Sequence, residues 1–81
     1  MLADLASEVM IGGDFSAAAS GYELAISTDP NYAPAWRGKG LALERLGMKR
    51  EAATAFRQFL NLQPNGASAE KIRQRLRAIE P

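Results

Sequence analysis

The chain has 81 residues, ten of them Lys or Arg and nine Asp or Glu, for a formal net charge of +1. It contains no cysteine and no histidine, which excludes disulfides, thiolate chemistry and the side chain that most often serves as general base or zinc ligand. We expect one small domain with no cofactor and no metal site.

No apolar run approaches the roughly 18 residues that a membrane span requires, and no signal peptide follows Met1. We therefore expect no membrane partner. A cytoplasmic location is favoured, although a piece of an exported protein fits the same residues.

Charge is divided unevenly along the chain. Residues 1–30 hold five acidic residues and no basic one, whereas residues 31–81 hold ten basic and four acidic residues. Such polarity can steer a charged partner. The alternative is a set of solvated faces that differ without consequence.

Glycine and proline divide the chain into five predicted helices, and no alternation of apolar residues is long enough to predict a strand. The predicted helices span residues 2–11, 15–28, 33–46, 49–62 and 67–79. The connections between them are short, so neighbouring helices must be antiparallel. The sequence therefore predicts an all-α fold.

Local signals bound the first two predicted helices. Gly13 suits a left-handed C-terminal cap for the first, and Asp14 can cap the N-terminus of the second. Pro30 ends the second helix, because the residue before proline resists helical angles. That helix carries an apolar stripe at helical spacing, formed by Phe15, Ala18, Ala19, Tyr22, Ala25 and Ile26.

The third and fourth predicted helices are bounded in the same way. Pro34 lies in the first turn of the third helix, where a missing N–H costs nothing, and Gly47 suits a left-handed cap at its end. Pro64 ends the fourth helix. The fourth helix repeats the apolar stripe of the second through Ala52, Ala53, Phe56, Phe59 and Leu60.

The fifth predicted helix has one apolar stripe between two cationic sides. Lys71 and Arg75 flank the stripe on one side, and Arg73 and Arg77 flank it on the other. Only one face can therefore be buried, which is typical of a terminal capping helix in a protein built from stacked helices. The stripe consists of Ala69, Ile72, Leu76 and Ile79.

The chain repeats itself at a spacing of 34 residues, a period typical of helical repeat proteins. Residues 33–65 resemble the tetratricopeptide repeat. The matching residues are Trp36, Gly40, Leu43, Leu46, Gly47, Glu51, Ala52, Phe56, Leu60 and Pro64. An earlier repeat matches more loosely, through Leu2, Leu5, Ala6, Val9, Gly13, Phe15, Ala18, Tyr22, Ala25 and Pro30.

The resemblance implies a short right-handed α-solenoid of five antiparallel helices in a single domain, residues 1–81. Repeat one covers about residues 1–31, repeat two about 32–65 and a capping helix about 66–80. Small residues such as Gly40 are expected where the helices cross.

Two residues depart from the family pattern. Lys39 occupies a slot that is usually apolar, where its stem can pack while its ammonium reaches water. Phe59 stands in a slot that is usually small. We expect it to pack on Ile72 or Leu76 beneath the capping helix. The alternative is an aromatic side chain left open for a partner.

Proteins of this family bind peptides in the groove lined by the first helix of each repeat, and the resemblance implies the same site here. The predicted groove residues are Ser7, Met10, Arg37, Leu41, Glu44, Arg45, Lys71 and Arg75. Such a groove fits a segment with acidic and apolar residues. We expect charge reversal at Arg37 and Arg45 to weaken binding without lowering stability. The alternative is an unused face of solvated charges.

Some family members hold a C-terminal carboxylate in a clamp of Lys, Asn and Arg. The matching positions in this chain are Ala3, Ser7, Gly38, Ser68 and Ile72. None of them donates as the clamp requires, apart from the two weak hydroxyls. The resemblance therefore does not imply a receptor for chaperone tails.

We predict a non-catalytic scaffold or adaptor with a protein or peptide partner. An enzyme is not expected, since Glu44 and Glu51 lie on different predicted helices and no nucleophile or base accompanies them. A nucleic-acid partner is a weaker alternative, because no aromatic residue interleaves the cations of the fifth helix.

Self-association is the main alternative to a protein or peptide partner. Two repeats are fewer than the roughly three that stable stacking requires. Either Leu2, Leu5 and Val9, or the apolar stripe of the fifth helix, can bury against a second copy through the open repeat ends.

Overall fold

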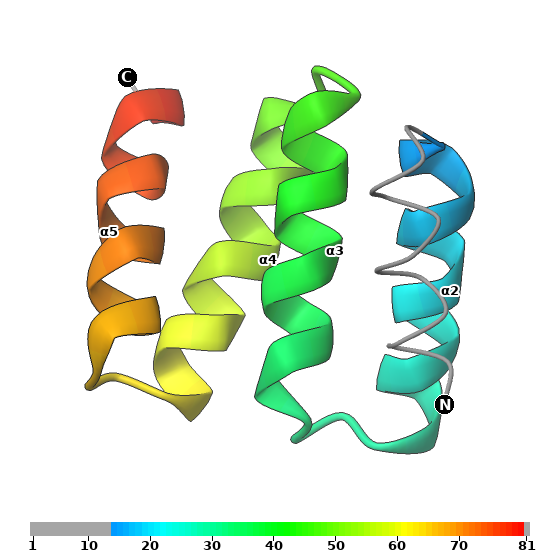
Figure 1. Cartoon of the computed structure of the whole chain (residues 1–81), viewed down its shortest axis with the longest axis horizontal. Helices are drawn as coiled ribbons and strands as arrows, with labels where there is room; N and C mark the ends of the chain where they lie inside the picture. Colours follow the sequence, from blue (N-terminus) through cyan, green and yellow to red (C-terminus); the bar gives the residue numbers. More distant parts are fainter. Residues whose placement is uncertain (1–13, 81) are drawn as a thin grey trace.

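The computed structural model describes residues 14–80, which fold as four helices joined by short connections (Figure 1). The helices are α2 at Phe15–Thr28, α3 at Ala33–Arg45, α4 at Lys49–Leu62 and α5 at Ala67–Ile79. This part of the chain contains no strand, so the predicted all-α class is confirmed. The predicted helix at 2–11 lies outside the described residues, and the five-helix, right-handed solenoid stays a prediction.

Local signals set the ends of these helices. Oδ1 of Asp14 accepts a hydrogen bond of 3.0 Å from a backbone N–H in the first turn of α2, as an N-cap should. Gly47 has a φ of +79°, and the following Met48 N–H donates to the carbonyl of Leu43 at 2.9 Å. This left-handed cap ends α3 at Arg45, one residue before the predicted end.

Consecutive helices run in opposite directions, as the short connections require (Figure 1). α3 packs against both α2 and α4, and α5 packs against α4. None of the helices in residues 14–80 is both long and apolar enough to cross a membrane.

The core consists of two clusters of buried apolar side chains. The cluster between α2 and α3 contains Ala18, Tyr22, Ala35 and Ala42. The cluster that joins α3, α4 and α5 contains Ala33, Leu43, Ala52, Phe56, Phe59 and Ile72. Small residues are common in both clusters, so the helices approach closely around a few aromatic rings.

Two glycines of α3 lie where rings from the neighbouring helices cross it. A Cβ atom added at Gly40 would lie 2.4 Å from Cδ1 of Phe56, as the predicted helix crossing requires. A Cβ atom added at Gly38 would lie 2.2 Å from Cζ of Tyr22. The sequence pattern assigned no packing role to Gly38, because the ring that requires it comes from α2.

The structure shows the surroundings of both residues that depart from the family pattern, Phe59 and Lys39. Phe59 is fully buried in the same cluster as Ile72, so its core role is confirmed and the alternative of an open aromatic side chain is wrong. The ammonium of Lys39 does not only reach water. It binds Oε1 of Glu23 at 2.6 Å and lies 5.5 Å from the centre of the Trp36 ring.

α5 covers α4 with its apolar stripe, as predicted for a capping helix. Ala69 and Ile72 are buried, and Leu76 and Ile79 pack against the same cluster. The stripe is therefore not free to bury against a second copy, which corrects that form of the self-association hypothesis. The form that uses the predicted first helix lies outside the described residues.

Candidate functional site

Two polar contacts join α3 to α5 across the predicted groove. Nη1 of Arg37 donates to Oγ of Ser68 at 3.1 Å, and Nε of Arg75 donates to Oε1 of Glu44 at 2.8 Å. The Glu44 side chain is only 19% exposed, and that of Arg75 is 40% exposed. These predicted groove charges therefore find partners within the chain.

Arg37 is held more firmly than the sequence pattern predicts. Besides its bond to Ser68, its guanidinium lies 5.8 Å from the centre of the Phe59 ring. Such cation–π contacts contribute roughly 0.5–2 kcal/mol, depending on exposure. Arg45 turns the other way and lies 6.0 Å from the ring centre of Phe15 on α2. From these contacts we expect charge reversal at the two arginines to lower stability as well as binding, whereas the sequence alone predicted an effect on binding only.

Two predicted groove cations, Arg45 and Lys71, are exposed and make no ion pair with any residue in 14–80. Arg45 lies against the Phe15 ring of α2, whereas Lys71 lies on α5. Lys71 lines a shallow hollow of about 370 Å³ together with Glu44, Gln74, Arg75 and Ala78. Lys71 is therefore the exposed cation without an ion pair on the α5 side of the predicted groove.

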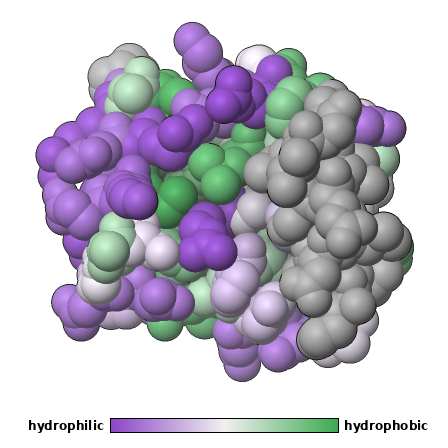
Figure 2. All heavy atoms as spheres, in the orientation of Figure 1, coloured by the Kyte–Doolittle hydropathy of each residue, from purple (hydrophilic) through white to green (hydrophobic). Residues whose placement is uncertain are grey.

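Apolar surface gathers in the middle of the face shown in Figure 2, with hydrophilic surface beside it. Leu41, a predicted groove residue on α3, is half-buried and packs against the cluster that joins α3, α4 and α5. We call the described part of this site the α3–α5 groove, formed by Arg37, Leu41, Glu44, Lys71 and Arg75. Ser7 and Met10 lie outside the described residues.

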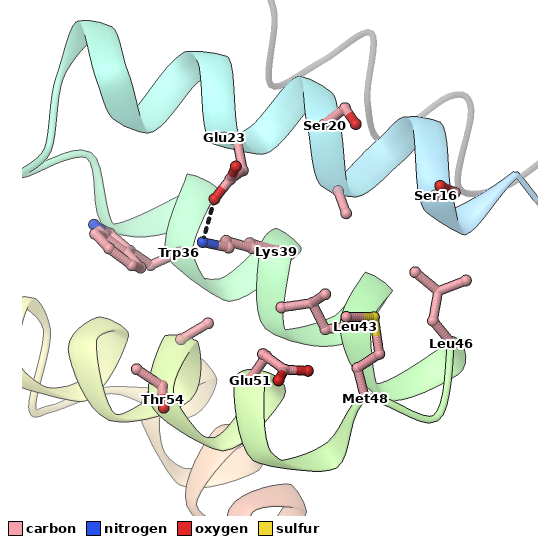
Figure 3. A pocket seen from close by; sticks show the side chains of 12 residues that line it. Ser16, Ser20, Glu23, Trp36, Lys39, Leu43, Leu46, Met48, Glu51 and Thr54 are labelled. Carbon is pink, nitrogen blue, oxygen red and sulfur yellow. Dashed lines mark hydrogen bonds and ion pairs between the residues drawn. The ribbon is translucent and has the colours of Figure 1, made fainter.

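A second hollow, of about 450 Å³, lies on the other side of α3, between α2 and α4 (Figure 3). We call it the α2–α4 hollow. Its lining residues are Ser16, Ala19, Ser20, Glu23, Trp36, Lys39, Leu43, Leu46, Met48, Glu51, Thr54 and Ala55. The sequence does not predict this hollow, because side chains from three helices form it. The apolar Leu46 and Met48 on either side of the Gly47 cap were the signal that could have indicated it.

The cations of α5 do not form a continuous phosphate-binding surface. Arg73 pairs with Glu70, and Arg75 pairs with Glu44. The two cations that remain are six residues apart and lie on different sides of the helix. Within residues 14–80 there is also no group of three or more side chains that could hold a metal ion.

Residues 12–77 match the tetratricopeptide repeat family, and the chain belongs to this family. No curated protein matches the sequence. Among solved structures, the chain is similar to the first tetratricopeptide repeat domain of Spaghetti (RPAP3) bound to the HSP90 peptide SRMEEVD. The two are 28% identical, with a TM-score of 0.88. The similarity covers 96% of this chain and 60% of that chain, so this chain spans less than two thirds of its neighbour.

Proposed function

We propose that this chain is a non-catalytic scaffold or adaptor module, which binds a protein or peptide segment with acidic and apolar residues in the α3–α5 groove. The observation that carries the proposal is the exposed Lys71, which lines a hollow together with Glu44 of α3 and Arg75 of α5. Leu41 of α3 adds a half-buried apolar side chain, three residues before Glu44. In this proposal the chain is one domain of two repeats, α5 is its cap, and Ser7 and Met10 extend the groove.

The groove offers a partner two kinds of contact. Leu41 can pack against an apolar side chain, while Lys71 and Arg75 attract a carboxylate. A carboxylate that binds Arg75 must share it with Glu44, which already accepts its Nε–H. Lys71 therefore contributes most to the preference for an acidic segment.

The peptide of the RPAP3 domain is not the partner that we propose for this chain. Gly38 and Ile72 occupy two positions where clamp-bearing family members place donors, and both are buried here. Ser68, at a third such position, already accepts a hydrogen bond from Arg37. We therefore propose a segment that is recognised through its side chains rather than through a C-terminal carboxylate.

Calorimetric titration with two synthetic peptides tests this function. One peptide is rich in Glu and Leu, and the matched peptide carries Lys in place of each Glu. We expect the acidic peptide to bind more tightly. Lys71→Gln should weaken its binding about threefold, as expected for the loss of one exposed charge contact. Arg77→Gln is the matched control, because Arg77 is an exposed cation on another side of α5. Equal affinity for both peptides, or equal effects of the two variants, would contradict the proposal.

A further inference from the structure

The α2–α4 hollow combines a buried apolar lining with exposed apolar edges. Leu43 and Ala55 are its buried apolar residues. Leu46 and Met48 stand beside Leu43 at one end of the hollow (Figure 3). Their exposed fractions are 42% and 44%.

These exposed side chains are not scattered over the surface. Residues 14–80 expose three large apolar side chains, and two of the three, Leu46 and Met48, line this hollow. The third is Leu24, which does not line it. A concave surface with apolar edges and a few polar groups is the usual form of a binding site.

The charged residues that line the hollow give it a net negative charge. Its three charged residues are Glu23, Lys39 and Glu51. Glu23 and Lys39 pair with each other, and the Lys39 ammonium also lies over the Trp36 ring (Figure 3). Glu51 is exposed and forms no ion pair with any residue that the structure describes. The hollow therefore carries one carboxylate in excess, and a cation is its complementary group.

We propose that the α2–α4 hollow is a second docking surface, for a protein segment in which an aliphatic side chain lies next to a Lys or Arg. The aliphatic side chain packs among Leu43, Leu46 and Met48, and the cation pairs with Glu51. This surface is on the opposite side of α3 from the α3–α5 groove, and it does not depend on the function proposed for that groove. The chain can therefore hold two segments of opposite charge at once.

The chain contains site-specific reporters for this surface. Trp36 is the only tryptophan of the chain and lines the hollow, and so does Met48, whose methyl group can be followed by NMR. The probes are a short peptide of Leu and Lys and a matched peptide with Glu in place of Lys. We expect the Leu–Lys peptide to shift the Met48 methyl resonance and the Trp36 fluorescence at concentrations where the Leu–Glu peptide shifts neither.

Two pairs of variants test the contacts separately. Glu51→Gln should weaken binding of the Leu–Lys peptide about threefold, as for one exposed charge pair. Glu70→Gln, which changes an exposed acidic residue in the first turn of α5, should leave it unchanged. Leu46→Gln should weaken binding about fivefold or more through lost apolar contact. Leu24→Gln is its matched control.

Three results would overturn the proposal. The first is equal binding of the two peptides, or an equal response to Glu51→Gln and Glu70→Gln. The second is a concentration-dependent dimer in sedimentation that Leu46→Gln abolishes, which would assign the hollow to a second copy of the chain. The third is binding of the Leu–Lys peptide that responds to Lys71→Gln and not to Glu51→Gln. Such a result would place this segment in the α3–α5 groove. If instead the acidic peptide fails to bind, the function proposed for the α3–α5 groove is contradicted, but the proposal for the α2–α4 hollow is not.

Discussion

The two sides of α3 make contact with their neighbours in different ways. Toward α2 and α4, its backbone comes so close to Tyr22 and Phe56 that Gly38 and Gly40 have no room for a Cβ atom. Toward α5, the contacts are made by long side chains, with Arg37 reaching Ser68 and an ion pair joining the two helices further along.

This difference shows where the chain can accept a partner at low cost. Close-packed rings cannot move without opening a cavity, so the contacts of α3 with α2 and α4 are expected to dominate stability. Polar contacts between long, partly exposed side chains contribute little and can be rearranged. This difference is the reason that we propose the binding site on the α5 side of α3, where an entering segment would replace weak contacts and leave the core intact.

The largest effect is expected from filling the space at Gly40. Gly40→Leu forces a side chain into the ring of Phe56, and we expect the variant to lose its cooperative thermal transition in circular dichroism. Ala17→Leu, at an exposed position of α2, is the control and should unfold cooperatively. A cooperative Gly40→Leu variant of unchanged stability would show that the close approach is not required.

A substitution at Phe59 affects both sides of α3. Phe59 belongs to α4, its ring lies under the Arg37 guanidinium, and it shares a buried cluster with Ile72 of α5. Phe59→Ala should lower the free energy of unfolding by about 3 kcal/mol or more, through lost burial and the cavity that remains. Chemical denaturation measures this loss. Phe15→Ala removes a half-buried ring and should cost less, so equal losses would contradict the assigned burial.

A substitution at Gly38 tests whether α2 packs as closely against α3 as α4 does. Gly38→Ala places a methyl group against the Tyr22 ring, and overpacking of this kind costs about 1–3 kcal/mol. The same denaturation experiment measures it. A stabilised variant, as expected for Gly→Ala at an unobstructed helix position, would mean that the ring moves aside freely.

The smallest effect is expected on the α5 side. A double-mutant cycle with Glu44→Gln and Arg75→Gln should give a coupling energy of about 0.2–1 kcal/mol that decreases with added salt. A coupling well above this range would mean that the ion pair is structural. The α5 side would then not be the easily rearranged surface that the comparison indicates.

Much of the fold follows from the sequence, because helices and their caps depend on residues close together in the chain. The stripe of α5, the cap at Asp14 and the left-handed Gly47 were all predicted from local spacing and are present in the structure. The 34-residue period and the matching residues indicated the family, and the resemblance implied a small residue at Gly40, where the ring of Phe56 leaves no room for a Cβ atom.

Within residues 14–80, the sequence by itself therefore determined the four helices, the faces that α2, α4 and α5 bury, and the family of repeats. Only the tertiary structure decided which groove charges remain free. Arg75 meets Glu44, a residue 31 positions earlier, and this leaves Lys71 as the exposed cation of the α3–α5 groove. It also decided that Gly38 must accommodate Tyr22 and that a hollow lies between α2 and α4. Helical spacing specifies the direction in which a side chain points. It does not specify the residue across the interface, which depends on how the helices are placed against one another.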